Sequence, residues 1–158
     1  MRFAKVIQDI KQPHKDAIEA MGYGGLLHMP EMCHMRNMIL DLADAYQVSN
    51  QRFNICDQNI TIHPEDVSNI MGLLIEGYGV DKYVKKTMQS EEKTVNIELY
   101  KRYADGRHKL ELSRLEQMIS TSKSSDDGFK RAFVFFTIGA ILAPTTQTHV
   151  HWSYIQVV

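Results

Sequence analysis

The stretch from Phe129 to Ala143 is apolar on nearly every side of a helix, and it constrains the fold more than any other segment. A helix of this kind lies either in the middle of a protein core or in a membrane. Its longest apolar run starts at Ala132, is interrupted by Thr137 and Gly139, and reaches only about 18 Å, against a hydrocarbon thickness of about 30 Å. The sequence therefore predicts a central buried helix and no membrane span.

The composition fits one domain built around such a helix. The chain has 158 residues, of which 44% are hydrophobic, and a chain of this length buries roughly 70% of its unfolded surface on folding. General disorder is excluded, and a formal net charge of −1 gives no basic bias toward nucleic acid. The two cysteines, Cys33 and Cys56, are too few for a disulfide framework.

Two amphipathic helices are predicted in the first third of the chain. Pro13 suits a first helical position, and the helix runs to about Met21, with Gly22 as its stop. A second helix is predicted from Pro30 to Tyr46, because apolar residues repeat there with helical spacing. The stripe consists of Met35, Met38, Ile39, Leu42 and Tyr46.

A β-hairpin and a third helix follow. Apolar and polar residues alternate over 53–62 on either side of the turn sequence 57–59, which predicts two short strands. Pro64 opens the third helix, and Gly77 and Gly79 are predicted to end it.

The chain between the third helix and the central helix is more polar. Residues 81–106 read as a charged insertion, in which Tyr103 lines one side of a solvated helix. Ser113 and Glu116 have the spacing of a capping box, and the pair Asp126–Asp127 is predicted to cap the central helix. The predicted fold is mainly α, a helical domain with one small β-hairpin.

Candidate catalytic and metal-binding residues do not form a recognisable motif. His149 and His151 lack the spacing of a zinc site with either cysteine. Soft metal ligands gather in one segment, but helical spacing points them in different directions. They are Met29, Met32, Cys33, His34, Met35 and Met38. We predict no metal, no cofactor, no catalytic residue and no small-molecule substrate, with a thiol- or metal-dependent enzyme centred on Cys33 and His34 as an alternative.

Two basic stretches suggest other roles. Tyrosines alternate with basic residues between Lys82 and Tyr103, but nearby acidic residues dilute the charge, so a solvated face fits better than a nucleic-acid groove. The N-terminus carries basic residues at positions 2, 5, 11 and 15 against Asp9, which leaves a mitochondrial presequence open. It lacks the apolar stretch of a secretory signal, so we expect an intracellular protein, nuclear or cytoplasmic.

Three stretches, in this order along the chain, resemble one family. The first is Gly22–Leu27, the second is Ile60–Val67 continued by Ile70–Leu73, and the third runs from Phe129 to Thr145. Together they resemble the plant mobile domain, or aminotransferase-like plant mobile domain, which occurs in transposon-derived proteins and in MAINTENANCE OF MERISTEMS-type nuclear proteins. The resemblance covers about residues 13–152.

The resemblance implies a largely helical domain that acts through protein partners and has no established aminotransferase activity. Family domains are longer, so residues 1–158 resemble a single truncated domain, the N-terminal portion alone. A shortened bundle would leave apolar surface bare, for another protein or a second copy of the chain to cover. The partner-binding residues expected from this argument are Phe129, Phe133, Phe136, Trp152, Tyr154 and Ile155.

The predicted function is therefore a non-enzymatic protein–protein interaction module derived from a plant mobile element. One alternative is an interfering or toxic fragment of a selfish locus, acting in mitochondria if the N-terminus is a presequence. The other is the enzyme centred on Cys33 and His34.

Overall fold

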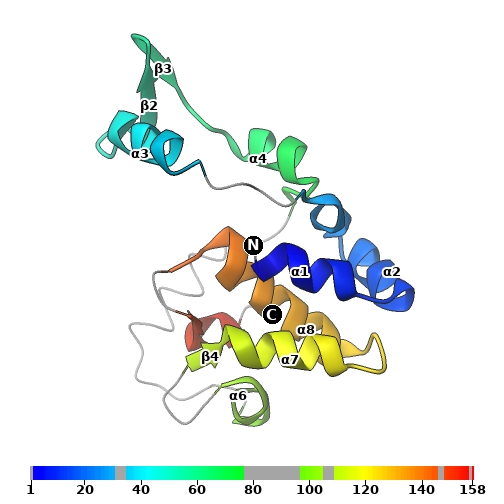
Figure 1. Cartoon of the computed structure of the whole chain (residues 1–158). Helices are drawn as coiled ribbons and strands as arrows, with labels where there is room; N and C mark the ends of the chain where they lie inside the picture. Colours follow the sequence, from blue (N-terminus) through cyan, green and yellow to red (C-terminus); the bar gives the residue numbers. More distant parts are fainter. Residues whose placement is uncertain (1, 31–34, 77–96, 105–108, 146–147, 157) are drawn as a thin grey trace.

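The computed structural model describes residues 2–30, 35–76, 97–104, 109–145, 148–156 and 158. Seven α-helices lie in this part of the chain: α1 (Arg2–Asp9), α2 (Gln12–Ala20), α3 (Arg36–Ala45), α4 (Pro64–Met71), α6 (Ile97–Tyr103), α7 (Leu112–Thr121) and α8 (Asp127–Thr137). Shorter helical segments are the 3-10 turns η1 (Gly24–His28) and η3 (Trp152–Gln156) and the π-helical turn η2 (Ile138–Leu142). Figure 1 shows the arrangement of these elements.

Two small antiparallel sheets accompany the helices. The first has the strand order β1-β2-β3, and in the second β4 pairs with β5. Their bounds are β1 (Tyr46–Gln47), β2 (Arg52–Ile55), β3 (Gln58–Ile60), β4 (Lys109–Glu111) and β5 (His149–His151). The mainly α fold and the small hairpin are confirmed, whereas the β4–β5 pair was not predicted.

Helix α8 is the centre of the core, as its sequence predicts. Phe3 of α1 stacks on Phe136 with ring centroids 5.8 Å apart and also contacts Phe133 at 6.4 Å. From another direction Tyr103 of α6 meets Phe135 edge-on at 5.3 Å. Helix α7 packs along α8, so helices that are distant in sequence enclose it. None of the described helices has the length and apolar character that a membrane crossing needs.

The predicted cap of α8 is also present. Asp126 is the N-cap residue, and its carboxylate accepts a hydrogen bond from the backbone N–H of Phe129 at 2.9 Å and from Ser124 Oγ at 3.1 Å. The hydrogen bond from Phe129 is the main reason that the pKa of Asp126 lies below its ordinary value.

The N-terminal segment is a core helix. Phe3, Val6 and Ile7 of α1 are buried against α8 and α7, and Arg2 pairs with Glu116 of α7 at 2.6 Å. Arg2 and Lys5 are exposed between the buried positions of this helix.

The helix predicted from Pro64 is α4, but it ends earlier than predicted. Its last residue is Met71, because Gly72 adopts the left-handed conformation (φ 62°) that commonly terminates helices. The backbone N–H of His63 donates to Asp66 at 2.8 Å, which closes the first turn.

Three other local predictions need correction. The hairpin turn is formed by Cys56 and Asp57, both with positive φ, so it lies one residue earlier than predicted and has the geometry of a tight two-residue turn. Ser113 lies inside α7, whose N-cap is Glu111. Most of the predicted 81–106 insertion lies outside the described residues, but Tyr103 at its end is fully buried rather than solvated.

Two glycines bring distant segments into backbone contact. A Cβ atom on Gly25 of η1 would lie 2.2 Å from the carbonyl oxygen of Met71, and one on Gly72 would lie 2.8 Å from the Cα of Gly25. Met71 and Leu73 pack against the core beside this contact. The end of α4 is therefore seated on the helical body at a position where only glycines fit.

Candidate functional site

Residues 35–76, which we call the arm, differ from the rest of the described chain in their burial. The arm comprises α3, β1, β2, β3 and α4, and none of its residues is buried. In Figure 1, α3, β2 and β3 project away from α1, α7 and α8. Helix α3 packs on β2, so these elements support each other at the far end of the arm.

The arm carries nearly all of the exposed apolar surface. Among the described residues, every large hydrophobic side chain that is well exposed belongs to the arm, with Leu142 as the exception. Those in the arm are Met35, Met38, Ile39, Leu40, Leu42, Tyr46, Val48, Ile55, Ile60, Ile62, Val67, Ile70, Leu74 and Ile75. Apolar side chains scattered singly on a surface are ordinary, whereas large contiguous apolar patches occur at protein or membrane interaction sites, in ligand grooves and at aggregation-prone surfaces.

Part of this surface is continuous because of the strand register. The α3 stripe runs into β1 at Tyr46, which pairs with Phe53 of β2, and their rings lie 5.0 Å apart. Phe53 in turn pairs with Ile60 of β3, and Ile55 points to the same side as Phe53 because side chains alternate along a strand. Helix stripe and sheet face share Tyr46, and we call the two together the apolar face: Met35, Met38, Ile39, Leu42, Tyr46, Phe53, Ile55 and Ile60.

A hollow of about 410 Å³ lies beside this face. Tyr46, Phe53 and Ile62 give it apolar walls, and Asn50 and Arg52 are among its polar lining residues. It is a depression that is open to solvent, not an enclosed cavity.

The arm is also acidic. It contains Arg36 and Arg52 against six acidic residues, a net charge of −4, while the rest of the chain carries +3. The acidic residues are Asp41, Asp44, Asp57, Glu65, Asp66 and Glu76. Asp41 follows Met38 by three residues, so it borders the apolar face on the helix.

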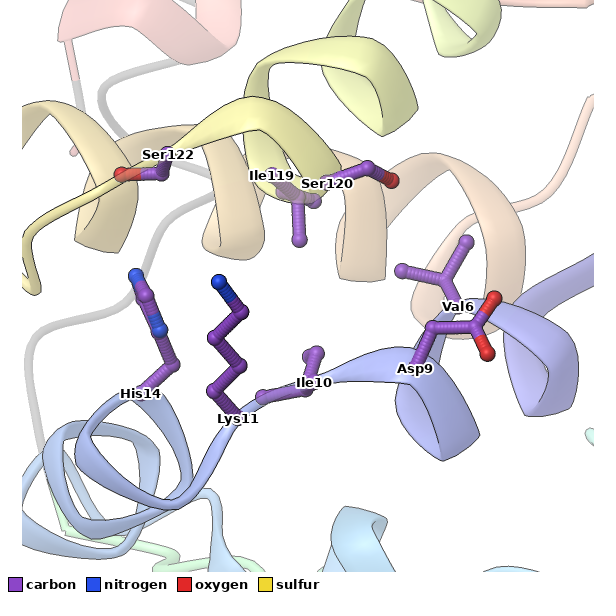
Figure 2. A pocket seen from close by; sticks show the side chains of 8 residues that line it. All are labelled: Val6, Asp9, Ile10, Lys11, His14, Ile119, Ser120 and Ser122. Carbon is purple, nitrogen blue, oxygen red and sulfur yellow. The ribbon is translucent and has the colours of Figure 1, made fainter.

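The cavity in Figure 2 is a different kind of space. It lies between the α1–α2 junction and the end of α7, and Lys11 and His14 point into it toward Ser122. Its volume is about 80 Å³, which is enough for a few water molecules but below the size of ordinary ligand sites. His14 is otherwise engaged in the core, with Nε2 3.2 Å from the carbonyl oxygen of Ser124 and its ring 4.3 Å from that of Phe129.

The candidate metal and thiol residues are not brought together in the described chain. Cys33 and His34 lie outside the described residues, and Cys56 is exposed in the hairpin turn. His149 and His151 share a face of β5, but no group of three His, Cys, Asp or Glu side chains in the described part converges as a metal site requires.

Nδ1 of His151 lies 2.8 Å from Ser153 Oγ and 3.3 Å from the backbone nitrogen of Ser153. Burial, with a smaller contribution from neighbouring His149, lowers the pKa of His151. This pair joins β5 to η3.

The structure places the expected partner-binding residues inside the molecule. Phe129, Phe133, Phe136 and Ile155 are between 0% and 3% exposed, and Tyr154 is half-buried. The expectation that the central helix is left bare is therefore wrong, because α1 covers α8 and η3 packs into the core. Nothing is described for the side chain of Trp152.

The exposed surface on the arm was not foreseen. The α3 stripe is visible in the sequence as a helical repeat, but a repeat alone predicts burial and does not say whether another element covers it. Its side chains are exposed because the core of the body is already filled by α1, α6, α7 and η3.

Comparison with known proteins corrects the resemblance to the plant mobile domain, because no such family matches the chain. In the structure, two of the three stretches that suggested it meet at the contact between Gly25 and Gly72. No curated protein and no solved structure matches the chain. One family matches all of residues 1–158, and the chain belongs to it: the domain of unknown function DUF8566.

Proposed function

We propose that this protein is a non-enzymatic interaction module that binds another polypeptide through the apolar face of its arm. The observation that carries the proposal is the division of apolar surface: among the described residues, Leu142 is the large hydrophobic side chain of the body that is well exposed, while no residue of the arm is buried. A covered apolar face would contribute roughly 25 cal/mol for each Å² removed from water.

The burial of the body supports this choice of surface. The residues first expected to bind a partner form the aromatic core, in which Phe133 contacts Phe3, Tyr23 and Phe129. A partner could reach these rings only by displacing α1. The arm needs no such rearrangement, since its side chains already face solvent.

The test is site-specific photo-cross-linking in the cells that express the protein. A photo-reactive amino acid replaces Ile39 on the apolar face, and in a matched variant it replaces Gln117, an exposed residue of α7. We expect a discrete cross-linked species from position 39 that is absent from position 117. The additional change Leu42→Ser should abolish the species.

The absence of a discrete adduct at position 39, or an adduct that persists with Leu42→Ser, would overturn the proposal. Circular dichroism of each variant shows whether the helical body is intact, so that a loss of the adduct can be assigned to the surface.

A further inference from the structure

We infer that Met35 and Met38 are oxidation sites, and that a peroxide, by converting them to methionine sulfoxide, weakens the binding of a partner to the apolar face. This inference rests on the proposed function and adds a means of regulating it. Two observations carry it: the positions of the methionines in the fold, and their place on the apolar face.

The methionines that the structure describes fall into two groups. Met35 and Met38 are 64% and 51% exposed, and both belong to the apolar face. An oxidant must reach the sulfur atom, so these two should react before methionines that are shielded by their neighbours. The shielded group is partly buried and packs against the core: Met21, Met29, Met71 and Met118.

The two exposed methionines lie together at the start of α3. Met35 is the N-cap residue, and its carbonyl oxygen accepts a hydrogen bond from the backbone N–H of Ile39 at 3.0 Å, so it already belongs to the first turn. Met38 follows three residues later and therefore lies on the same side of the helix. Oxidation of both residues would change one continuous part of the apolar face.

The reaction is a two-electron oxidation of each thioether. The sulfur attacks hydrogen peroxide and the O–O bond breaks. One oxygen atom stays on the sulfur as the sulfoxide, and the other leaves as water after it takes up the remaining proton. The sulfur is oxidised and the peroxide is reduced. Methionine sulfoxide reductases return the product to the thioether, so the change is reversible.

Oxidation changes what the apolar face can bind. A thioether behaves as an apolar group, whereas a sulfoxide is polar and accepts hydrogen bonds. An apolar partner that covers the sulfoxide removes its oxygen from water and offers no donor in return, which makes binding less favourable. We expect oxidation of both residues to weaken partner binding at least about tenfold.

The first measurement is peptide mapping by mass spectrometry after graded treatment of the full chain with hydrogen peroxide. The changes Cys33→Ser and Cys56→Ser remove the thiols, which would otherwise consume oxidant and form products of their own. We expect Met35 and Met38 to be oxidised at least about fivefold faster than the partly buried methionines. Equal rates in the two groups would overturn the assignment of the sites.

The second measurement repeats the photo-cross-linking from position 39, in an extract of the expressing cells, with the full chain before and after peroxide treatment. We expect the adduct to decrease at least about tenfold on oxidation and to return after treatment with methionine sulfoxide reductases. The double variant Met35→Leu and Met38→Leu should keep its adduct after peroxide, because leucine is apolar, similar in size and inert to peroxide. Met118→Leu on α7 is the matched control and should give no protection.

Three results would overturn the inference: an adduct that persists when both methionines are oxidised, an adduct lost equally in the double leucine variant, or one that the reductases do not restore. Loss of helix on oxidation, measured by circular dichroism, would also overturn it, because the protein would then have unfolded. The proposed function is tested separately. No adduct from the unoxidised chain removes the interaction module, while the peptide map still decides whether Met35 and Met38 are the oxidation sites.

Discussion

The hydroxyl of Thr137 lies inside the core, at the junction of α8 and the π-helical turn η2. Within the described residues, its Oγ1 is the buried side-chain polar atom for which no hydrogen-bond partner is found. A buried hydroxyl without a partner has lost its hydrogen bonds to water and gained none in return, which destabilises the folded state.

Replacement of Thr137 by valine should raise the free energy of unfolding by about 1 kcal/mol, because the shape is kept and the unsatisfied hydroxyl is removed. Urea denaturation measures the change. Thr121→Val is the control, since Thr121 is exposed and its hydroxyl donates to the carbonyl oxygen of Gln117. A decrease in stability for Thr137→Val would mean that the hydroxyl has a partner in solution.

His151 is a second residue whose chemistry is set by its surroundings. Nδ1 accepts the backbone N–H of Ser153, which requires a neutral imidazole. Burial and, to a smaller extent, the nearby His149 lower its pKa below the ordinary value of 6.5. As the pH falls, the unfolded chain therefore binds this proton before the folded protein does.

The contribution of His151 to stability is thus complete above pH 6.5 and is lost as the pH falls through the lower pKa of the folded state. We expect the urea midpoint to be lower at about pH 5 than at about pH 7.5. His151→Gln should reduce this difference, while His28→Gln at an exposed position of η1 should preserve it. An unchanged difference in the His151 variant would exclude the residue as a source of the pH dependence.

At the scale of elements, η2 brings the end of the central helix close to the second sheet. A Cβ atom on Gly139 would lie 2.3 Å from Cγ2 of Val150 in β5 and 2.7 Å from Cδ2 of Leu112 at the start of α7. Both of these neighbours are buried, so neither can move aside freely. The absence of a side chain allows α7, η2 and β5 to meet.

Gly139→Ala should therefore destabilise the protein by about 1–3 kcal/mol through overpacking, although alanine is the better helix former. The matched variant is Gly24→Ala, where the nearest atom to the added methyl group would be Cγ of Glu19 at 3.2 Å, on a flexible side chain. We expect that change to cost less than about 1 kcal/mol. Equal denaturation midpoints for the two variants would contradict the packing argument.

Elements with local signals could be predicted, and those that depend on distant contacts could not. Proline and glycine mark both ends of α2, and Asp126 marks the start of α8. The pairing of β4 with β5 joins residues 109–111 to residues 149–151, and nothing in either segment alone specifies the other. Helix α1 was missed because its four buried residues lie within a short basic segment.

At the scale of the whole molecule, the body and the arm have different sources of stability. The aromatic side chains of α8 are enclosed on several sides, whereas no residue of the arm is buried. Local opening costs less where few apolar contacts are broken. The arm should therefore open without unfolding of the body.

Hydrogen exchange measures this difference directly. Backbone amides of α3, β2 and β3 should exchange at least about a hundredfold faster than those of α8, which corresponds to about 3 kcal/mol in opening free energy. Peptides from α7 provide the internal reference, since α7 packs along α8. Equal protection of arm and body would show that the apolar face is covered in the free protein.

The candidate site could not be found from the sequence for a related reason. Helical spacing identifies two kinds of apolar surface in this chain, the α3 stripe and the all-round apolar α8, and both suggest burial. Which of them is covered depends on α1, whose Phe3 and Val6 occupy the space beside α8. A prediction based on the more hydrophobic helix therefore selected residues of the core.

The contact between Gly25 and Gly72 has a consequence for variation among members of the family. Because Gly25 and Gly72 have no side chains, the base of the arm lies directly against the body. A side chain at either position would push the two backbones apart and change the direction in which the arm projects. Natural variants bearing alanine or serine there should hold the apolar face at another angle. One small substitution would then change the direction of the apolar face relative to the body without altering any residue of that face.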